Sequence, residues 1–372
     1  MKKHSVRFIL GALCVLLLLG HAGRFWQIPF VTALDAYLYD VRVRLSMPNT
    51  VDQRVVIVDI DENSLAEIGR WPWGRNVVAE LVRRLTDDYK VALIGFDVVF
   101  AEPDESSGLK VLQAMGRSQL KGEPAFQKAL AELAPSLDYD KVLADTLRGR
   151  PVVLGYYFSS TQNAQQAGVL PPPVFPAGSF SGDRIPFVSW QGFGANLSML
   201  QQAAASSGHF NPLVDFDGSS RRVPLVVEFQ GNYYEALSLA VLRTLLGNAQ
   251  LKPGFPPGEK IIEWLDVEGE RGSVRIPVDE HVSALIPYRG YERSFPYLSA
   301  ADVLKGRVTA EQLAGRIVLV GTTAPGLMDL RATPVGGAYP GVEAHANLIA
   351  GMLAGTIKQK PGYVLAIEVL QL

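Results

Sequence analysis

The chain has 372 residues, 48% hydrophobic and 19% charged, so it is globular rather than disordered. Its formal net charge of -2 is spread over interspersed acidic and basic residues, and without a basic patch we expect no nucleic-acid partner. The single cysteine, Cys14, excludes a disulfide within the chain and a cysteine-based zinc site.

The N-terminus combines a basic start with an apolar run. Lys2, Lys3 and Arg7 precede the uncharged residues 8–23. This pattern fits either a cleavable signal peptide or an uncleaved membrane anchor with Arg7 and Arg24 at its two interfaces. Both alternatives keep the basic residues in the cytoplasm and place the following chain outside. We expect an anchor within residues 1–29.

The C-terminal residues 359–372 begin with Lys360, Pro361 and Gly362 and continue as an apolar run. Pro and Gly followed by a run of apolar residues predict the start of a helix. We expect the beginning of a second transmembrane helix. The alternative is a short amphipathic helix that packs on the domain, because the run contains Glu368 and Gln371.

The first and last thirds of the interior alternate between strand and helix. Short apolar runs bounded by polar residues predict buried parallel strands, and apolar residues spaced three and four apart predict helices. The region from 101 to 125 is rich in Ser, Gly and charge and predicts a long loop. The predicted strands are 55–59, 91–100, 151–158 and 316–321, and the predicted helices are 75–85, 139–147 and 341–353.

The middle third has a different character. Asp217–Gly218 is a hairpin signal between two predicted strands, and residues 232–246 predict a helix. Further β-rich segments lie at 261–264, 273–276 and 284–288. We therefore predict an α/β fold, with a mainly parallel sheet and flanking helices, an inserted antiparallel β-rich subdomain, and one preceding transmembrane helix.

Several motifs, in order, resemble the CHASE2 sensor domain over residues 30–355. The matching segments are 39–45, 58–65, 69–75, 94–100, 208–211 with Asp217, Gly218 and Arg221, 317–326 with Asp329, and 340–346. The resemblance implies a bacterial inner-membrane protein with an uncleaved anchor, a juxtamembrane helix at 30–48 and a periplasmic or extracellular sensor domain at 49–358.

The resemblance also implies a cytoplasmic output domain after further membrane helices. An adenylate or guanylate cyclase is the expected output, and a histidine kinase, a diguanylate cyclase or a Ser/Thr kinase is the alternative. Two other classes stay open: a ligand-free structural dimerisation module, and a periplasmic metal-assisted hydrolase. No catalytic residue is predicted, since the chain has neither GxSxG nor GxGxxG.

The candidate ligand-binding residues are polar and aromatic side chains near predicted strand ends. Ligands of open α/β sheets bind outside the carboxyl ends of the strands, where a small extracytoplasmic ligand is expected. Tryptophans 71 and 73 could stack on a ligand or fix a loop. The candidates are Asp59, Asp61, Trp71, Trp73, Arg75, Asp97, His209, Arg221, Asp329 and His345.

Three of these candidates could hold a divalent cation. Asp59, Asp61 and Asp97 are expected in one crevice, and Ca²⁺ or Mg²⁺ prefers oxygen ligands. The alternative is that Asp61 caps residues 62–68 while Asp97 pairs with Arg75.

Two further expectations concern regulation. His345 is either a packing residue or a pH sensor that titrates near neutrality. Cyclase and kinase outputs act as dimers, so we expect a parallel homodimer with contacts in residues 8–45. Its apolar stripe is Leu34, Leu38, Val41 and Leu45.

Overall fold

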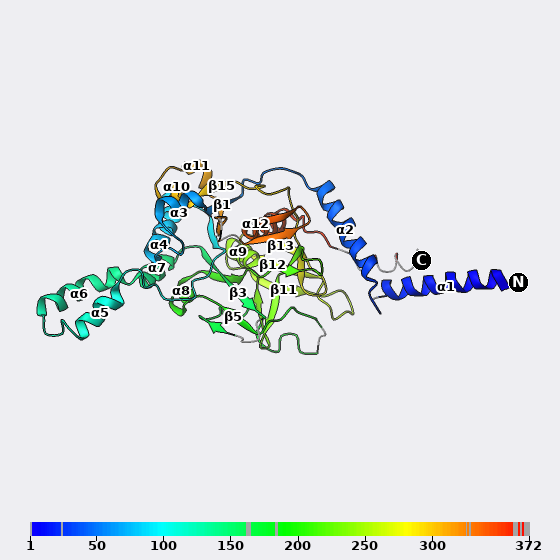
Figure 1. Ribbon diagram of the computed structural model, residues 1–372, viewed down its shortest axis with the longest axis horizontal. Coiled ribbons are helices and arrows are strands. Elements are labelled where there is room, and N and C mark those ends of the chain that lie inside the picture. Colours follow the sequence, from blue (N-terminus) through cyan, green and yellow to red (C-terminus); the bar gives the residue numbers. More distant parts are fainter. Residues whose placement is uncertain are drawn as a thin grey trace.

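The structure of the protein is a computed structural model that describes residues 2–23, 25–160, 165–182, 185–324, 326, 329–359, 364 and 367. Helical segments extend from opposite ends of a rounded body (Figure 1). The N-terminal helices α1 (Lys2–Ala22) and α2 (Pro29–Ser46) lie at one end, and the hairpin of α5 (Leu109–Arg117) and α6 (Pro124–Leu137) lies at the other. The second membrane helix expected at 359–372 falls outside the described residues, apart from 359, 364 and 367.

A parallel sheet forms the centre of the body. Its strand order is β15-β1-β16-β2-β3-β6, and all of these neighbours pair in parallel. The end of β3 also pairs antiparallel with β5, which is followed by β4. The strands are β1 (Val55–Ile60), β2 (Leu93–Phe96), β3 (Val152–Ser159), β4 (Gln166–Ala167), β5 (Gly192–Gly194), β6 (Ser206–His209), β15 (Tyr297–Ser299) and β16 (Ile317–Thr322).

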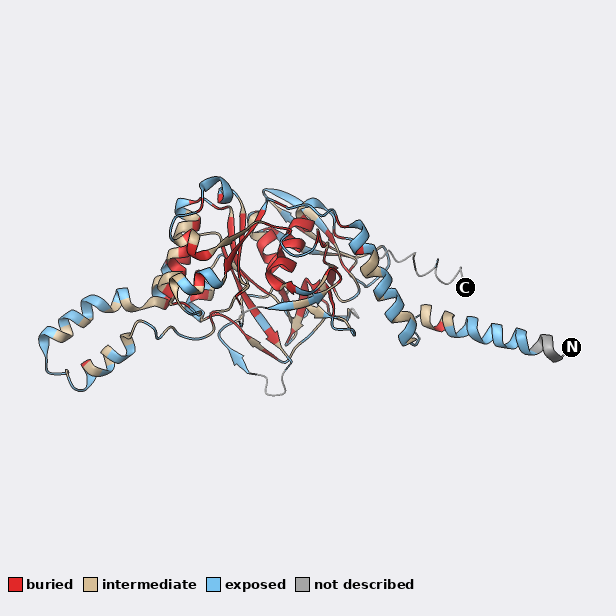
Figure 2. Cartoon of the chain, turned by 45° about the horizontal axis from the view of Figure 1, so that its top comes forward, coloured by how far each residue is buried: buried red, intermediate tan, exposed pale blue. Residues whose placement is uncertain are grey.

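Helices cover both faces of this sheet, because its strands are apolar on both sides. Along β1, Ile57 faces the layer of α9 and α12, whereas Val56 and Val58 face the opposite layer. The buried centre of α12 is visible in Figure 2. The first layer holds α9 (Leu237–Leu245) and α12 (Gly341–Ala354), and the second holds α3 (Glu62–Ile68), α4 (Arg75–Arg83), the π-helix Arg84–Asp88, α7 (Tyr139–Leu147), α8 (Ser198–Ala203), α10 (Ala300–Leu304) and α11 (Ala310–Leu313).

Antiparallel sheets pack beside the first layer. The largest have the orders β11-β12-β13 and β14-β8-β7. Their buried residues share one hydrophobic core with α9 and α12, so the predicted β-rich insertion is present but has no core of its own. These strands are β7 (Leu213–Val214), β8 (Ser220–Pro224), β9 (Val226–Phe229), β10 (Asn232–Glu235), β11 (Gln250–Gly254), β12 (Trp264–Gly269), β13 (Gly272–Pro277), β14 (Ser283–Leu285), β17 (Leu330–Thr333) and β18 (Gly336–Pro340).

Two local predictions were wrong. The predicted loop at 101–125 contains α5 and the start of α6, whose apolar sides pack on each other. The predicted helix at 232–246 begins only at Leu237, because residues 232–235 pair with β9 as a strand. Sheet pairing, and not the local sequence pattern, decided this boundary.

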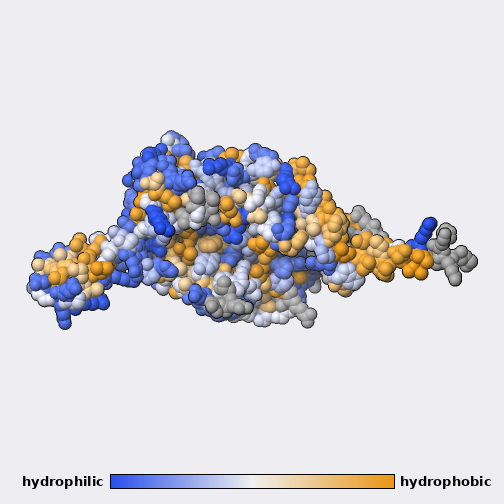
Figure 3. Space-filling view, in the orientation of Figure 1, coloured by the Kyte–Doolittle hydropathy of each residue, from blue (hydrophilic) through white to orange (hydrophobic). Residues whose placement is uncertain are grey.

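The N-terminal helices expose many apolar side chains, and the orange surface at that end of Figure 3 follows them. Phe8 of α1 is 81% exposed and Leu45 of α2 is 82% exposed. No helix among the described residues is long and apolar enough to cross a membrane. Val43 of α2 and Met47, which directly follows the helix, are buried in the core of the body, so this helix is anchored to the domain at its C-terminal end.

Candidate functional site

Two cavities lie at the carboxyl edge of the parallel sheet. One, of about 420 Å³, is lined by Asp59, Asp61 and Thr323, which follow or end β1 and β16. The other, of about 570 Å³, is lined by Asp97, which follows β2, and by Asp329. The polar residues at the strand ends therefore line two separate cavities rather than one crevice.

The smaller cavity has carboxylates that are already hydrogen-bonded. Asp59 accepts hydrogen bonds from the Thr323 backbone N–H at 2.9 Å and from its hydroxyl. Asp61 accepts from the Ser64 backbone N–H and from the Ser299 hydroxyl, each at 2.8 Å. Asp61 is thus the N-cap of α3, as the structural alternative predicted. Burial, followed by the nearby Asp61 charge, raises the pKa of Asp59 above its usual value.

The larger cavity is lined by aromatic and charged side chains. Trp71, Tyr157 and Phe210 contribute rings. Asp329 is held by Arg331, with Arg331 nitrogens 2.6 and 3.1 Å from the Asp329 Oδ2 atom. The Gly341 N–H donates to the Asp329 backbone carbonyl at 2.8 Å, which joins this loop to the start of α12.

Gly341 gives the Asp329 side chain room where α12 meets this loop. A Cβ atom on Gly341 would lie 2.6 Å from the Asp329 carboxylate, closer than Cβ contacts allow. Any larger residue would push the Asp329 carboxylate away from its position in the cavity.

The three aspartates expected around a metal do not meet. Asp59 and Asp61 line the smaller cavity, and Asp97 lines the larger one with Asp329. Among the described residues, no group of three or more His, Cys, Asp or Glu side chains could hold a metal ion. The middle strand β16 separates β1 from β2, which keeps Asp97 apart from the β1 carboxylates.

Arg75 does not pair with Asp97, so that part of the structural alternative was wrong. Its guanidinium lies 3.7 Å from the Asp140 carboxylate and stacks 4.7 Å over the Phe100 ring. The Asp104 carboxylate accepts from the Arg75 backbone N–H, placing a negative charge at the N-terminal end of α4. Asp104 and Asp140 lie 29 and 65 residues after Arg75 in the sequence, so no local pattern indicated them as its partners.

The two tryptophans have different roles. The Trp73 ring is buried, and its Nε1–H donates to the Gly69 backbone carbonyl at 2.9 Å, which fixes the loop before α4. Trp71 packs edge-on against Trp73, with ring centroids 5.3 Å apart, and lines the larger cavity. Only Trp71 is therefore placed to contact a ligand.

The two candidate histidines lie in the core. His209 is fully buried among the rings of Tyr156, Phe158 and Trp190. Burial lowers the pKa of His209 to about 3 and that of His345 to about 4. The expectation that His345 titrates near neutrality is wrong, because its environment favours the neutral ring.

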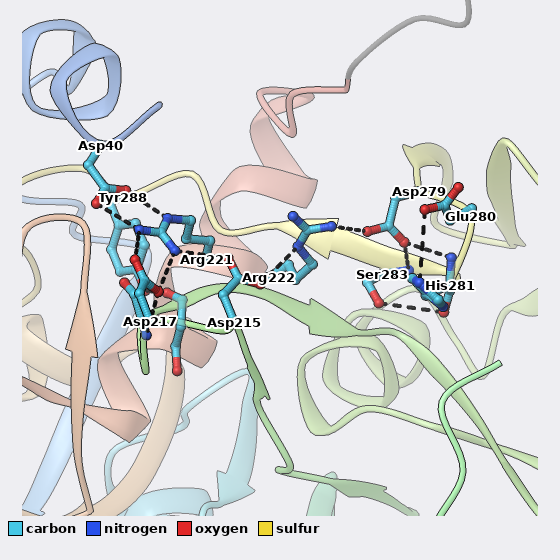
Figure 4. A network of polar contacts seen from close by, with 12 residues as sticks. Asp40, Asp215, Asp217, Arg221, Arg222, Asp279, Glu280, His281, Ser283 and Tyr288 are labelled. Carbon is cyan, nitrogen blue, oxygen red and sulfur yellow. Dashed lines mark hydrogen bonds and ion pairs between the residues drawn. The ribbon is translucent and has the colours of Figure 1, made fainter. Parts of the chain in front are cut away.

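Arg221 lies in a separate polar network that joins α2 to the body (Figure 4). Its side chain is only 4% exposed, and three carboxylates converge on it. Asp40 of α2 binds it with two bonds of 2.8 Å, Asp215 binds at 3.0 Å, and Asp217 binds at 2.7 and 2.9 Å. This multidentate arrangement is the strong form of a guanidinium–carboxylate contact. Burial alone would lower the pKa of Arg221, but the three carboxylates outweigh it and raise the pKa above its usual value. The hydrogen bond to Asp217 is the largest of these raising effects.

Two polar residues that join distant parts of the structure were not predicted from the sequence. Asp40 belongs to the joint just described. Glu343 is fully buried in α12 and accepts hydrogen bonds from the backbone N–H groups of Arg293 and Ser294 and from the Tyr297 hydroxyl. A single acidic residue within a mainly apolar helix was the available signal, because a buried carboxylate needs donors.

Residues 10–371 match the family described as the CHASE2 domain. No curated protein and no solved structure matches the chain.

Proposed function

This chain belongs to the CHASE2 family, a family of sensory domains of signalling proteins, and we propose that it is the extracytoplasmic input region of a membrane-bound signalling protein. The observation that carries the proposal is the joint at Arg221. A buried guanidinium binds Asp40 of α2, which follows the N-terminal apolar helix, and so ties the body to the segment nearest that helix.

The segments that enter and leave the domain also touch. The Lys358 Nζ atom donates to the Ser46 hydroxyl at 3.0 Å, at the end of α2. Arg44 of α2 donates to the Pro334 backbone carbonyl at 3.2 Å, beside the strands that precede α12. We propose that a change in the position of the body is passed to both connecting segments.

The membrane attachment is assigned to α1. Large apolar side chains between residues 6 and 17 are exposed, including Phe8, Ile9 and Leu16. Basic residues precede them, which favours a cytoplasmic N-terminus and a body outside the cytoplasm.

A C-terminal nucleotide cyclase is the output that we propose, with a histidine kinase, a diguanylate cyclase or a Ser/Thr kinase as alternatives. The coding sequence beyond codon 372 tests this choice directly. The proposed assembly is a parallel homodimer, because cyclase and kinase outputs act as dimers. The exposed stripe of α2 is its proposed contact.

Topology tests the proposal itself. Alkaline phosphatase fused after residue 60 or after residue 300 is expected to be active in a bacterial host, because both positions would lie outside the cytoplasm. A cytoplasmic reporter fused at the same sites is expected to be silent and serves as the control. Cytoplasmic activity from either site would exclude an extracytoplasmic input region.

A further inference from the structure

The larger cavity contains a carboxylate that no hydrogen-bond donor satisfies. The Asp97 backbone N–H is fixed by the Val320 carbonyl at 2.8 Å, which sets where its side chain begins. Among the described residues, no N–H or O–H donates to the Asp97 carboxylate, although it lines the cavity. Asp97 is partly exposed, and a partly shielded carboxylate without protein donors is free to bind a positive group from solution.

The positive side chains that line this cavity already have partners other than Asp97. Arg331 is bound to Asp329 by two hydrogen bonds to one oxygen. Arg75 donates to the Glu102 backbone carbonyl at 3.2 Å, lies near Asp140 and covers the Phe100 ring. The cavity lining holds the carboxyl groups of Asp97, Glu102 and Asp329 against these two guanidinium groups, which leaves one uncompensated negative charge when all are ionised.

The remaining wall is aromatic. Trp71, Tyr157 and Phe210 line the cavity, and the rings of Tyr157 and Phe210 lie 6.1 Å apart at an angle of 36°. Aromatic faces attract organic cations, and desolvation strengthens this attraction. A carboxylate without donors beside several rings is the combination that recognises an ammonium group.

We propose that this cavity binds a small organic cation, whose ammonium group contacts the Asp97 carboxylate and the rings of Trp71, Tyr157 and Phe210. The proposal names the ligand class for the sensory function proposed above and rests on it. The volume of about 570 Å³ leaves room for a compound several times the size of a tetramethylammonium ion.

Protonation gives the proposal a second signature. Burial, followed by the charge of Asp329, raises the pKa of Asp97 well above its usual value, and Arg331 opposes this shift. Arg75, Glu102 and Tyr157 are the other ionisable groups that line the same cavity. A cation binds the ionised carboxylate, so binding must expel the proton at low pH, and affinity rises as pH rises.

Choline and 3,3-dimethylbutan-1-ol separate charge from shape, because they are isosteres and only choline is charged. The full chain in detergent is titrated by calorimetry with each compound, up to about 20 mM. We expect choline to bind, more tightly at about pH 8 than at about pH 5, and the alcohol to bind at least about tenfold more weakly. Equal binding of the two compounds, or no binding of choline, overturns the proposal.

Two variants locate the site. Asp97→Asn is expected to weaken choline binding by at least about tenfold, and Asp145→Asn, an exposed carboxylate on α7, is expected to leave it unchanged. Tyr157→Leu removes a ring but keeps Asp97, and is expected to weaken choline binding about threefold. This variant still tests the site in case Asp97→Asn does not fold. Unchanged affinity in a folded Asp97→Asn or Tyr157→Leu chain overturns the assignment. Failure here leaves the topology result untouched, so it can be told apart from failure of the proposed function.

Discussion

Buried charged side chains hold this protein together where segments distant in sequence meet. Arg221 and Glu343 are each enclosed by several partners, whereas several exposed ion pairs link neighbours on one helix. Exposed pairs contribute little, since solvent screens them and their side chains lose entropy. Enclosed charges matter because removal of one partner leaves the others buried and unpaired.

Arg221→Met is expected to lower the free energy of unfolding by about 3–5 kcal/mol, because Asp40, Asp215 and Asp217 lose their common partner. The matched control is Arg275→Met. Arg275 of β13 pairs with Asp266 of β12 at the surface, and its replacement is expected to lower the free energy of unfolding by less than about 1 kcal/mol. Urea unfolding measures both. Equal losses in the two variants would contradict a special role for Arg221.

The buried histidines predict a loss of stability in acid. The pKa of each ring is 6.5 in the unfolded chain but about 3 for His209 and about 4 for His345 in the folded one. Between pH 6.5 and pH 4 the unfolded chain therefore takes up protons that the folded chain does not. Their contribution to stability is complete above pH 6.5 and falls as pH drops towards 4, by several kcal/mol in total.

Unfolding by urea across this pH range measures the loss. The double variant His209→Phe, His345→Gln is expected to flatten the dependence on pH, because neither replacement titrates. A pH dependence as steep as that of the unaltered chain would show that other groups cause it.

At the scale of elements, α2 has two different faces. One face packs on the body through Val43 and Met47 and through the Asp40–Arg221 contact. The other presents Leu34, Leu38 and Leu45, which are 44%, 41% and 82% exposed, with Val41 partly exposed between them. Their spacing of four, three and four residues is that of a coiled-coil seam.

Single cysteines along this seam are expected to crosslink across the proposed homodimer. Cys14 is first replaced by Ser, and cysteines are then placed at positions 34, 38, 41 and 45, with positions 35 and 42 as controls. Oxidative crosslinking in membranes should be strong at the seam and weak at the controls. Absence of crosslinks at every seam position would remove α2 as the dimer contact.

At the scale of the whole molecule, the two elongated ends are unlike each other. The N-terminal end of α1 and α2 is strongly apolar, whereas the α5–α6 hairpin at the opposite end carries a mixed surface (Figure 3). Gly116 is the only residue of α5 or α6 that is buried, so the hairpin adds little to the core. The polar cavities lie in the body between these ends, on the sheet edge that also meets the start of α12.

The sequence by itself determined the layered architecture. Runs such as Val55–Ile60 are apolar at every position and must be covered on both faces, and periodic helices such as α7 supply the cover. It also determined the cap at Asp61, because a cap depends on residues three positions apart. These features follow from short spacings, which are fixed before the chain folds.

Only the tertiary structure decided which charges meet. Arg221 and Asp40 are 181 residues apart, and Arg75 pairs with Asp140 rather than with Asp97, which is nearer in the sequence. Strand order placed β16 between β1 and β2, and this divided one expected carboxylate crevice into two cavities. Strand order and long-range pairing depend on how the whole core packs, because burial of apolar surface is not directional and leaves no local mark in the sequence.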